Sequence, residues 1–308
     1  MKFAKLSYLF ALPLLMPPIY AAAASPRTAQ SQERQPEIPG AIQALVKASE
    51  KGDANAQCRL ATAYFLGRDV QQDYAEAAKW YRMAAEQNNA LAQFNLGLMH
   101  YNGWGVKQDF AEALQWYRKS ADQGNAGAQN SLGAMYANGK GVKQDFAEAI
   151  QWYERSADQG YDTAQFNLGA MYYNGRGVKQ DFAKAAKRYR QAADHNHADA
   201  QFNLALMYST GKGVARSEAE AAKWFAKVAG HGDAEAQFKV GEMYSSGKGV
   251  ARDYRQAYLW LSLAASGSKG KTHDQALALR NATAKKMTPG QIAEAQRLAK
   301  EWKPEKSN

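Results

Sequence analysis

Three of the Ser-x-x-Lys sequences in this chain are the stretches that could supply covalent chemistry. They lie at Ser209–Lys212, Ser245–Lys248 and Ser266–Lys269. Penicillin-recognising enzymes use such a serine as a nucleophile at the start of a helix, with the lysine one turn later. Here the first two stretches each cross a glycine at which a helix is expected to end, and the third follows the last regular helix. We therefore predict no serine nucleophile.

Other patterns typical of a site are also incomplete. Gly270-Lys271-Thr272 lacks the earlier glycine of a phosphate-binding loop, and no strand is expected before it. His195, His197 and His231 recur near one edge, but no cysteine or carboxylate pattern completes a metal site. Cys58 is the only cysteine, so the chain has no internal disulfide. We expect no catalytic residues, no cofactor and no metal.

A repeat of 36 residues organises most of the sequence. An Ala-x-Ala-Gln sequence recurs without insertion or deletion, and its glutamines are Gln57, Gln93, Gln129, Gln165, Gln201 and Gln237. An exact period of this size is typical of a repeat array. The six repeats are 53–88, 89–124, 125–160, 161–196, 197–232 and 233–268.

Each repeat is predicted to form two helices. The first helix has a small residue on its apolar face, which predicts close approach of a neighbouring helix, and it ends at a glycine such as Gly103 or Gly139. An aspartate such as Asp109 then caps the second helix, with Glu112 three residues later in a capping-box pattern. Aromatic pairs of the second helix are predicted to stack in the core.

The pattern A-x-A-Q-x-x-L-G-x-x-Y-x-x-G-x-G-V-x-x-D-x-x-x-A-x-x-W-Y resembles the Sel-one-like repeat (SLR), a relative of the tetratricopeptide repeat. The resemblance covers residues 53–268, and the closing KKMTPGQIAEAQRLAKEW is similar to tails that follow such arrays. The sequence departs from the family pattern at His100, Arg188 and Glu218. The resemblance implies an all-α fold, an α-solenoid (right-handed superhelix) of six 36-residue helix-turn-helix repeats with helical caps, which binds other proteins. A hydrophobic content of 46% suits a continuous core.

The chain ends have their own compositions. Residues 1–24 combine a basic start, an apolar run of about 14 residues and an Ala-Ala-Ala cleavage motif, which predicts a cleaved signal peptide. Residues 25–37 are expected to form a flexible linker, 38–52 an N-terminal capping helix, and 269–308 a C-terminal helical cap with a basic tail. Helices are expected in this cap near 274–286 and 289–302, the second beginning with Thr288 as its N-cap and Gln291 at the capping-box position. No stretch reaches the ~20 apolar residues of a normal membrane span. We expect a periplasmic or secreted monomer with no lipid anchor and no transmembrane span after cleavage.

Two surfaces are candidates for binding. In tetratricopeptide-like solenoids the first helices line the concave surface, and the resemblance implies that ligands contact fixed positions there. On this chain the predicted groove residues are Phe94, Leu98, Tyr101, Asn130, Ala134, Phe166, Ala170, Tyr173, Phe202, Leu206, Phe238 and Glu242. These phenylalanines could instead be wedged between adjacent first helices.

The second candidate is a basic edge formed by the loops between helices. Its residues are Lys107, Lys140, Lys143, Arg176, Lys179, Lys212, Arg216, Lys248 and Arg252, in a chain of net charge +10. Such an edge could simply be solvated, or it could contact an acidic protein, an envelope polymer or a phosphorylated lipid surface.

The sequence therefore predicts an exported, non-enzymatic scaffold that binds a protein or peptide in the cell envelope. One alternative is a polyanion-binding envelope factor that uses the basic edge. The other is a β-lactam or cell-wall hydrolase like some cysteine-rich SLR relatives, which the single Cys58 does not support. Nucleic acid is not expected as a partner of an exported protein.

Overall fold

The computed structural model describes residues 40–305, which form fifteen helices and no strand. The helices are α1 (Gly40–Glu50), α2 (Ala54–Leu66), α3 (Tyr74–Glu86), α4 (Ala90–Asn102), α5 (Phe110–Asp122), α6 (Ala126–Asn138), α7 (Phe146–Asp158), α8 (Asp162–Asn174), α9 (Phe182–Asp194), α10 (Ala198–Thr210), α11 (Glu218–Gly230), α12 (Ala234–Ser246), α13 (Tyr254–Gly267), α14 (Lys271–Ala284) and α15 (Pro289–Glu301). The predicted all-α solenoid of helix-turn-helix repeats is confirmed. The predicted signal peptide and linker lie outside the described residues.

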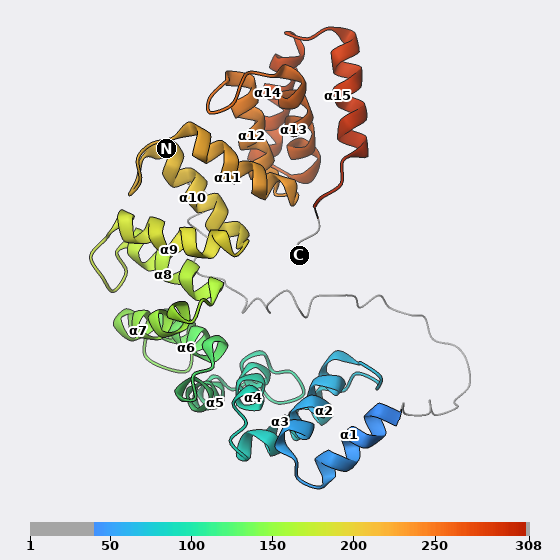
Figure 1. Ribbon diagram of the computed structural model, residues 1–308, viewed down its shortest axis with the longest axis vertical. Coiled ribbons are helices and arrows are strands. Elements are labelled where there is room, and N and C mark those ends of the chain that lie inside the picture. The colour runs from blue at the N-terminus through green and yellow to red at the C-terminus, as the bar shows by residue number, and fades with distance from the viewer. Residues whose placement is uncertain (1–39, 306–308) are drawn as a thin grey trace. The chain divides into compact units, whose positions relative to one another are not determined.

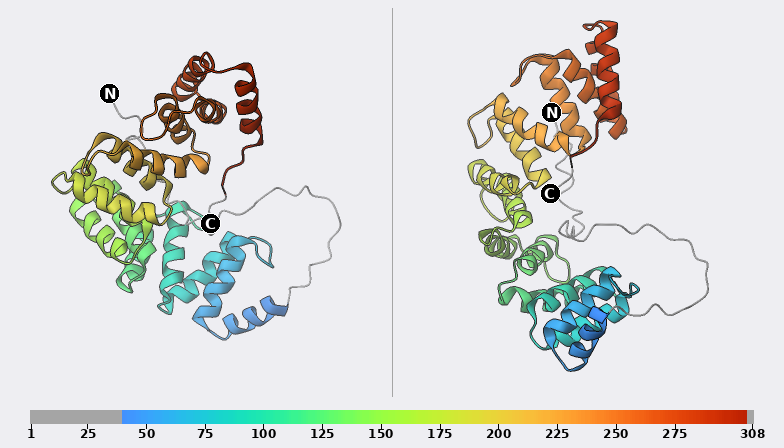
Figure 2. Two further views of the ribbon diagram at one scale, coloured as in Figure 1. Left: turned by 45° about the horizontal axis from the view of Figure 1, so that its top comes forward. Right: turned by 45° about the vertical axis from the view of Figure 1, so that its right-hand side comes forward.

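The chain divides into two compact units, one up to Gln159 and one from Gly160. Within each unit successive helices pack against one another as far as α14, and α15 packs on α13 (Figures 1 and 2). The first unit contains α1 to α7, and the second contains α8 to α15. None of the helices in the described part of the chain has both the length and the apolar composition that crossing a membrane requires.

Local signals in the sequence set the helix ends. Gly139 ends α6 with φ of +64°, a left-handed conformation that glycine adopts without a steric penalty. Asp109 caps α5, since its carboxylate accepts from the amides of Ala111 and Glu112 at 2.9 and 3.0 Å. The predicted capping box takes another form here, because the Glu112 carboxylate accepts from the Trp116 indole at 2.9 Å. This bond ties the first turn of α5 to an aromatic residue of the core.

The small residue on each first helix allows close approach of the second helix. A Cβ atom on Gly133 of α6 would lie 2.6 Å from the ring of Tyr153 on α7, closer than carbon atoms pack. Tyr153 is itself buried, with only 3% of its surface exposed. The predicted reason for a glycine inside this helix is therefore confirmed.

The register glutamines join neighbouring repeats. Gln93 is buried, and its amide donates to the carbonyl of Ala85 at the end of α3, at 3.0 Å. Its carbonyl accepts from Gln123 at 2.7 Å, at the end of α5. Gln129 repeats the arrangement with Ala121 and Gln159. Gln93 and Gln129 thus each bond to the ends of two successive second helices.

The last helices close the array and lead to a short tail. The side chain of Thr288 and that of Gln291 form both bonds of a capping box at the start of α15, as predicted. Beyond α15 the chain returns to the end of α11, where the amide of Glu305 donates to the carbonyl of Gly230 at 2.9 Å. His231 Nδ1 donates to the Glu305 carbonyl at 3.1 Å. The tail is therefore held by its backbone.

Candidate functional site

The predicted groove residues differ widely in exposure. Leu98, Asn130, Phe202 and Phe238 are buried, with 3 to 8% of their surface exposed. The half-buried groove residues are Phe94, Tyr101, Ala134, Phe166, Tyr173, Leu206 and Glu242, and Ala170 is buried. A partner on this surface would therefore meet chiefly the half-buried side chains.

Phe94 lies between its own repeat and the next one. Its ring centre is 5.8 Å from that of Tyr117 on α5. A Cβ atom added to Gly127, in the first turn of α6, would lie 3.3 Å from the Phe94 ring. The ring thus wedges between repeats, which leaves only part of it for a partner.

Phe166 has the same type of environment in the second unit. Its ring stacks on His197 with centres 4.7 Å apart, and it lies 5.6 Å from Tyr189. Phe202 packs edge-on against Phe225 at 5.3 Å. Phe166 therefore contacts the next repeat, whereas Phe202 packs against the second helix of its own repeat.

The two tyrosines of the predicted groove belong to a different arrangement. Tyr101 packs edge-on against Phe110, the first residue of α5, with ring centres 5.1 Å apart. Lys140 of the following repeat places its ammonium 5.1 Å from the centre of the same Phe110 ring. A cation near an aromatic face is stabilised by the ring quadrupole. Burial raises the pKa of Tyr101, so its hydroxyl stays neutral at physiological pH.

The arrangement recurs in the second unit. Tyr173 packs edge-on against Phe182 at 5.1 Å, and the Lys212 ammonium lies 5.3 Å from the Phe182 ring centre. Lys212 also donates to the Tyr173 hydroxyl at 3.3 Å. We call these two triplets, Tyr101–Phe110–Lys140 and Tyr173–Phe182–Lys212, the aromatic–lysine clusters.

A glycine contact holds the lysine in place. A Cβ atom on Gly213 would lie 2.1 Å from the Phe182 carbonyl oxygen, and Gly213 has φ of +69°. Only glycine can bring the loop so close to the start of α9, and this places the neighbouring Lys212 over the ring. Two surfaces that the sequence separates, the groove and the basic edge, therefore meet in these clusters.

At the junction of the first two repeats, an aromatic residue replaces the lysine. Trp104 occupies the position of Lys140 and stacks on Tyr74, with ring centres 6.2 Å apart. Phe65 completes this cluster at 5.2 Å from Tyr74 and 5.5 Å from Trp104. Tyr74 is 36% exposed, so this apolar cluster also reaches the surface.

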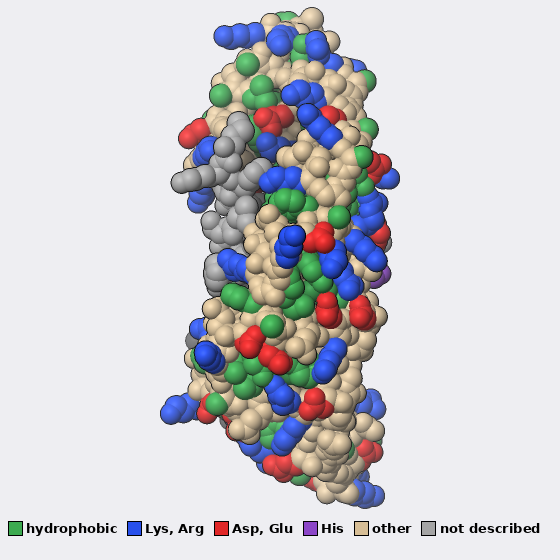
Figure 3. Space-filling model, turned by 90° about the vertical axis from the view of Figure 1, so that its left-hand side faces the viewer, with side chains coloured by type: hydrophobic (Ala, Val, Ile, Leu, Met, Phe, Trp, Pro, Cys, Tyr) green, Lys and Arg blue, Asp and Glu red, His purple; other side chains and the backbone are tan. Residues whose placement is uncertain are grey.

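The remaining basic-edge residues are mostly exposed. Lys107, Lys143 and Lys179 occupy one repeat position and lie on the surface, as do Lys248 and Arg252. Arg176 is half-buried. Arg216 pairs with the Glu218 carboxylate at 2.7 Å. On the face drawn in Figure 3, lysines and arginines are interspersed with acidic side chains.

The side chains that could act as nucleophiles take part in local structure. Ser209 donates to the Leu206 carbonyl at 3.0 Å, and Ser245 lies 3.5 Å from the Thr283 hydroxyl. Cys58 is buried, and burial raises the pKa of its thiol to about 11. The neutral thiol is a poor nucleophile.

The three histidines of the predicted edge occupy different structural positions. His197 caps α10 and stacks on Phe166, His231 holds the tail, and His195 is exposed at the end of α9. Within residues 40–305 no group of three His, Cys, Asp or Glu side chains is arranged to hold a metal ion.

Comparisons with known proteins agree with the repeat geometry. The Sel1 repeat profile matches residues 54–89, 90–125, 126–161, 162–197, 198–233 and 234–269. One similar crystal structure is c5321, described as a protective antigen present in uropathogenic Escherichia coli strains displaying an SLR fold. It is 32% identical with a TM-score of 0.72, over 84% of this chain and 64% of that one. This chain therefore spans less than two thirds of that protein.

A Sel1 repeat protein from Oxalobacter formigenes is also similar, at 35% identity and a TM-score of 0.68. The match covers 74% of this chain and 94% of that one. No curated protein matches the chain. Since six consecutive profile matches coincide with the helix pairs from α2 to α13, the chain belongs to the Sel1 repeat family.

Proposed function

We propose that this protein is an exported, non-enzymatic scaffold of the cell envelope that binds a protein or peptide partner through the aromatic–lysine clusters. Sel1 repeat proteins are in general protein-interaction scaffolds. The observation that carries the proposal is that Tyr101–Phe110–Lys140 and Tyr173–Phe182–Lys212 share one geometry and keep part of each aromatic ring at the surface.

The clusters suggest the chemistry of the partner. Each offers an aromatic edge and a lysine ammonium side by side, and Tyr74 with Trp104 adds a purely aromatic patch. A segment with apolar or aromatic residues next to acidic ones would satisfy both features. Aromatic anchors in an interface can contribute ~2 kcal/mol or more each.

The test begins with crosslinking in envelope extract to isolate a partner, followed by binding measurements with the purified pair. Tyr101→Ala together with Tyr173→Ala should weaken binding at least about tenfold while helical content stays unchanged. The groove variant Phe166→Ala plus Phe202→Ala should also weaken it, but Phe202 is buried and its loss affects folding as well. Gln115→Ala with Gln151→Ala, both exposed on second helices, is the matched control. Unchanged partner binding by the Tyr101→Ala plus Tyr173→Ala variant would exclude the aromatic–lysine clusters as the binding site.

A polyanion-binding function is the second candidate, favoured by the recurrence of exposed Lys107, Lys143 and Lys179 at one repeat position. The ion pair of Arg216 with Glu218 weakens it, because an acidic side chain on the same edge lowers the local positive potential. Charge reversal of Lys143, Lys179 and Arg216 should abolish binding if this function holds, and binding should fall steeply with salt. Binding through the clusters should respond only mildly to salt.

Export and the absence of catalysis need separate tests. Cleavage after Ala24 should leave Ser25, or a residue within about two of it, as the mature N-terminus. Intact mass of the protein from envelope fractions measures this, and retained Met1 would contradict export. Purified protein should not turn over nitrocefin, and a measurable rate would favour the hydrolase alternative.

A further inference from the structure

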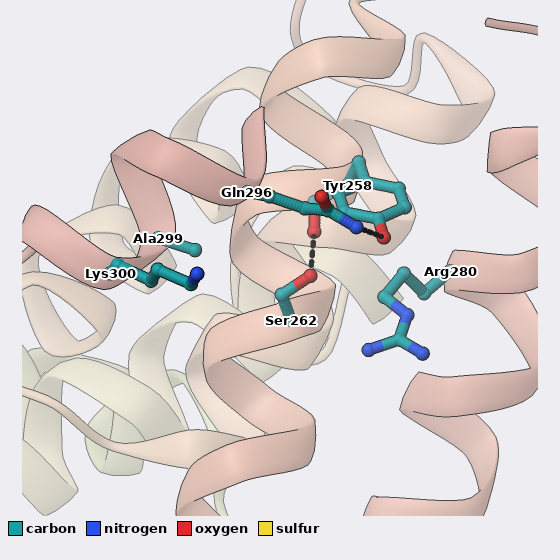
Figure 4. Close-up of a pocket in the computed structure, with 6 residues that line it drawn as sticks. All are labelled: Tyr258, Ser262, Arg280, Gln296, Ala299 and Lys300. Atoms are coloured by element: carbon teal, nitrogen blue, oxygen red, sulfur yellow. Dashed lines mark hydrogen bonds between the residues drawn. The ribbon is translucent and has the colours of Figure 1, made fainter. Parts of the chain in front are cut away.

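A cavity of about 310 Å³ lies between α13, α14 and α15, outside the repeats that carry the aromatic–lysine clusters. This volume is at the lower end of the range of small-ligand pockets. Figure 4 shows the residues that line it: Tyr258, Ser262, Arg280, Gln296, Ala299 and Lys300.

The lining is rich in hydrogen-bond donors and contains no carboxylate. Gln296 donates to the Tyr258 hydroxyl at 3.1 Å, which leaves the phenolic proton free to donate elsewhere. Ser262 lies between the two cationic side chains and donates to the Tyr258 carbonyl at 2.8 Å. Such a lining favours an anion and disfavours a cation.

The Arg280 guanidinium is incompletely satisfied. Its Nε is buried and has no hydrogen-bond partner among the described residues. The guanidinium donates a 3.3 Å hydrogen bond to the adjacent Asn281 side chain and lies 5.7 Å from the centre of the Tyr258 ring. A buried donor without an acceptor is unfavourable, so an acceptor arriving in the cavity would be stabilised.

The nearby carboxylates are already paired with other cations. Glu294 pairs with Arg255 at 3.3 Å, and Glu301 pairs with Arg297 at 2.7 Å. Within residues 40–305, neither Arg280 nor Lys300 has an ion pair. The cavity therefore contains two cationic side chains, from α14 and α15, and no internal counter-ion.

We propose that this cavity binds a carboxylate. The planar guanidinium of Arg280 can donate two parallel hydrogen bonds to a carboxylate, a geometry that suits this group. Lys300 supplies a second charge from α15, and the Tyr258 hydroxyl supplies a further donor. The cavity has room for the carboxylate and a small group attached to it, whether that is the end of a peptide, an acidic side chain or a free organic acid.

Nuclear magnetic resonance titration of the full-length mature protein tests the proposal. The probe is N-acetyl-alanyl-alanine with a free carboxylate, and its carboxamide is the matched neutral probe. The free acid should give saturable shifts at millimolar concentration, confined to amides of α13, α14 and α15, and the carboxamide should give none. Acetate and a blocked peptide with an internal glutamate distinguish a free acid and a side chain from a chain end.

Variants connect these shifts to the cavity. Arg280→Gln and Lys300→Gln should each weaken binding of the free acid about tenfold or more. Arg280→Lys, which keeps the charge, should have a smaller effect. Lys285→Gln changes an exposed lysine at the end of α14 and should leave binding unchanged. Circular dichroism verifies that each variant is folded.

Three results would overturn the proposal. The first is the absence of saturable shifts with the free acid. The second is equal binding by the Arg280→Gln and Lys300→Gln variants, or a loss with Lys285→Gln, which would indicate a diffuse attraction to surface charge. The third is tighter binding of inorganic phosphate than of every carboxylate probe, which would assign the cavity to another anion.

Discussion

Gln123 donates a hydrogen bond of 2.7 Å to Gln93, thirty residues earlier in the chain, and Gln93 donates in turn to Ala85. The pair connects three helices, α3, α4 and α5, with Gln93 buried and Gln123 at the exposed end of α5. In the next repeat Gln159 and Gln129 form the same bond. The spacing of this contact is therefore fixed by the repeat period.

The first prediction concerns this bond. Gln93→Met keeps the side-chain volume but leaves the Ala85 carbonyl and the Gln123 amide without their partner. Ala85 still accepts from the Asn88 amide and Gln123 can bond to water, so each lost hydrogen bond costs ~0.5–1.5 kcal/mol and the free energy of unfolding should fall by about 1–3 kcal/mol. Urea unfolding followed by circular dichroism measures it. Gln115→Met, at an exposed position of α5, should change little, and equal losses in the two variants would contradict the role of Gln93.

The second prediction concerns close packing of the helix pair. Gly133→Ala improves helix propensity by ~1 kcal/mol but forces a methyl group into the Tyr153 ring. Overpacking of this kind costs ~1–3 kcal/mol, so the free energy of unfolding should decrease. Gly290→Ala in α15 is the matched control, because no atom lies within 4 Å of the added carbon. It should be neutral or stabilising, and stabilisation by both changes would show that α6 and α7 can move apart freely.

The third prediction concerns pH. Burial lowers the pKa of His100, with a further contribution from Arg82 and partial compensation by Glu112. The Arg82 guanidinium donates to His100 Nε2 at 3.1 Å, and a proton on that nitrogen would break the bond. The unfolded chain takes up the proton near pH ~6.5, before the folded chain does. The stability contributed by neutral His100 is therefore complete above that pH and is lost as pH falls below it.

Two variants test this dependence. His100→Tyr introduces the residue found at the same position in the next repeat, where Arg118 donates to the Tyr136 hydroxyl. As the pH is lowered from about 7 to 5, the midpoint temperature of thermal unfolding should fall less in this variant than in the wild type, since tyrosine does not titrate in that range. The converse change, Tyr136→His, should increase that loss. A pH profile that neither substitution alters would rule out His100 as the source.

The fourth prediction concerns the array as a whole. Because repeats contact mainly their neighbours, stability should be close to the sum of repeat and interface contributions. Deletion of residues 125–160 removes one whole period and should leave a shorter folded helical protein. Deletion of 125–142 removes α6 and its loop but leaves α7 without its partner, and should cause a much larger loss. Equal thermal midpoints for the two deletions would contradict the repeat description.

The local structure could be predicted from the sequence because it depends on local chemistry. The glycine that ends α6 and the aspartate that caps α5 act within a few residues of themselves, and the exact period repeats each signal. The helices α14 and α15 were expected at 274–286 and 289–302 and are found at Lys271–Ala284 and Pro289–Glu301. The predicted start of α15 agrees better with the structure than that of α14, because Thr288 and Pro289 signal the beginning of a helix.

The contacts between repeats could not be predicted in this way. Position along one helix does not reveal that Phe202 is buried while Leu206 remains half-exposed, because the neighbouring repeat decides it. The assignment of Lys140 to a solvated edge missed its contact with Phe110, which depends on how closely two loops approach. The cavity beside Arg280 likewise depends on three helices that follow no period.

One missed contact did have a signal in the sequence. The first four repeats end their second helix with an acidic residue, Glu86, Asp122, Asp158 or Asp194, and the fifth has Gly230 instead. A Cβ atom at Gly230 would lie 3.2 Å from the Glu305 carboxyl group, and an acidic side chain would also repel it. The exception in the period thus marks the place where the tail packs.

The helices outside the period determine how the array can grow. A bare stack of repeats exposes, at each end, the face that another repeat would cover, so identical copies could join end to end like monomers of a linear polymer. Helix α1 packs on α2 at the beginning of the array, while α14 packs on α12 and α13, and α15 on α13, at its close. These helices occupy the places where a further repeat would otherwise stack on α2 and α13, and so act as terminators of the described array.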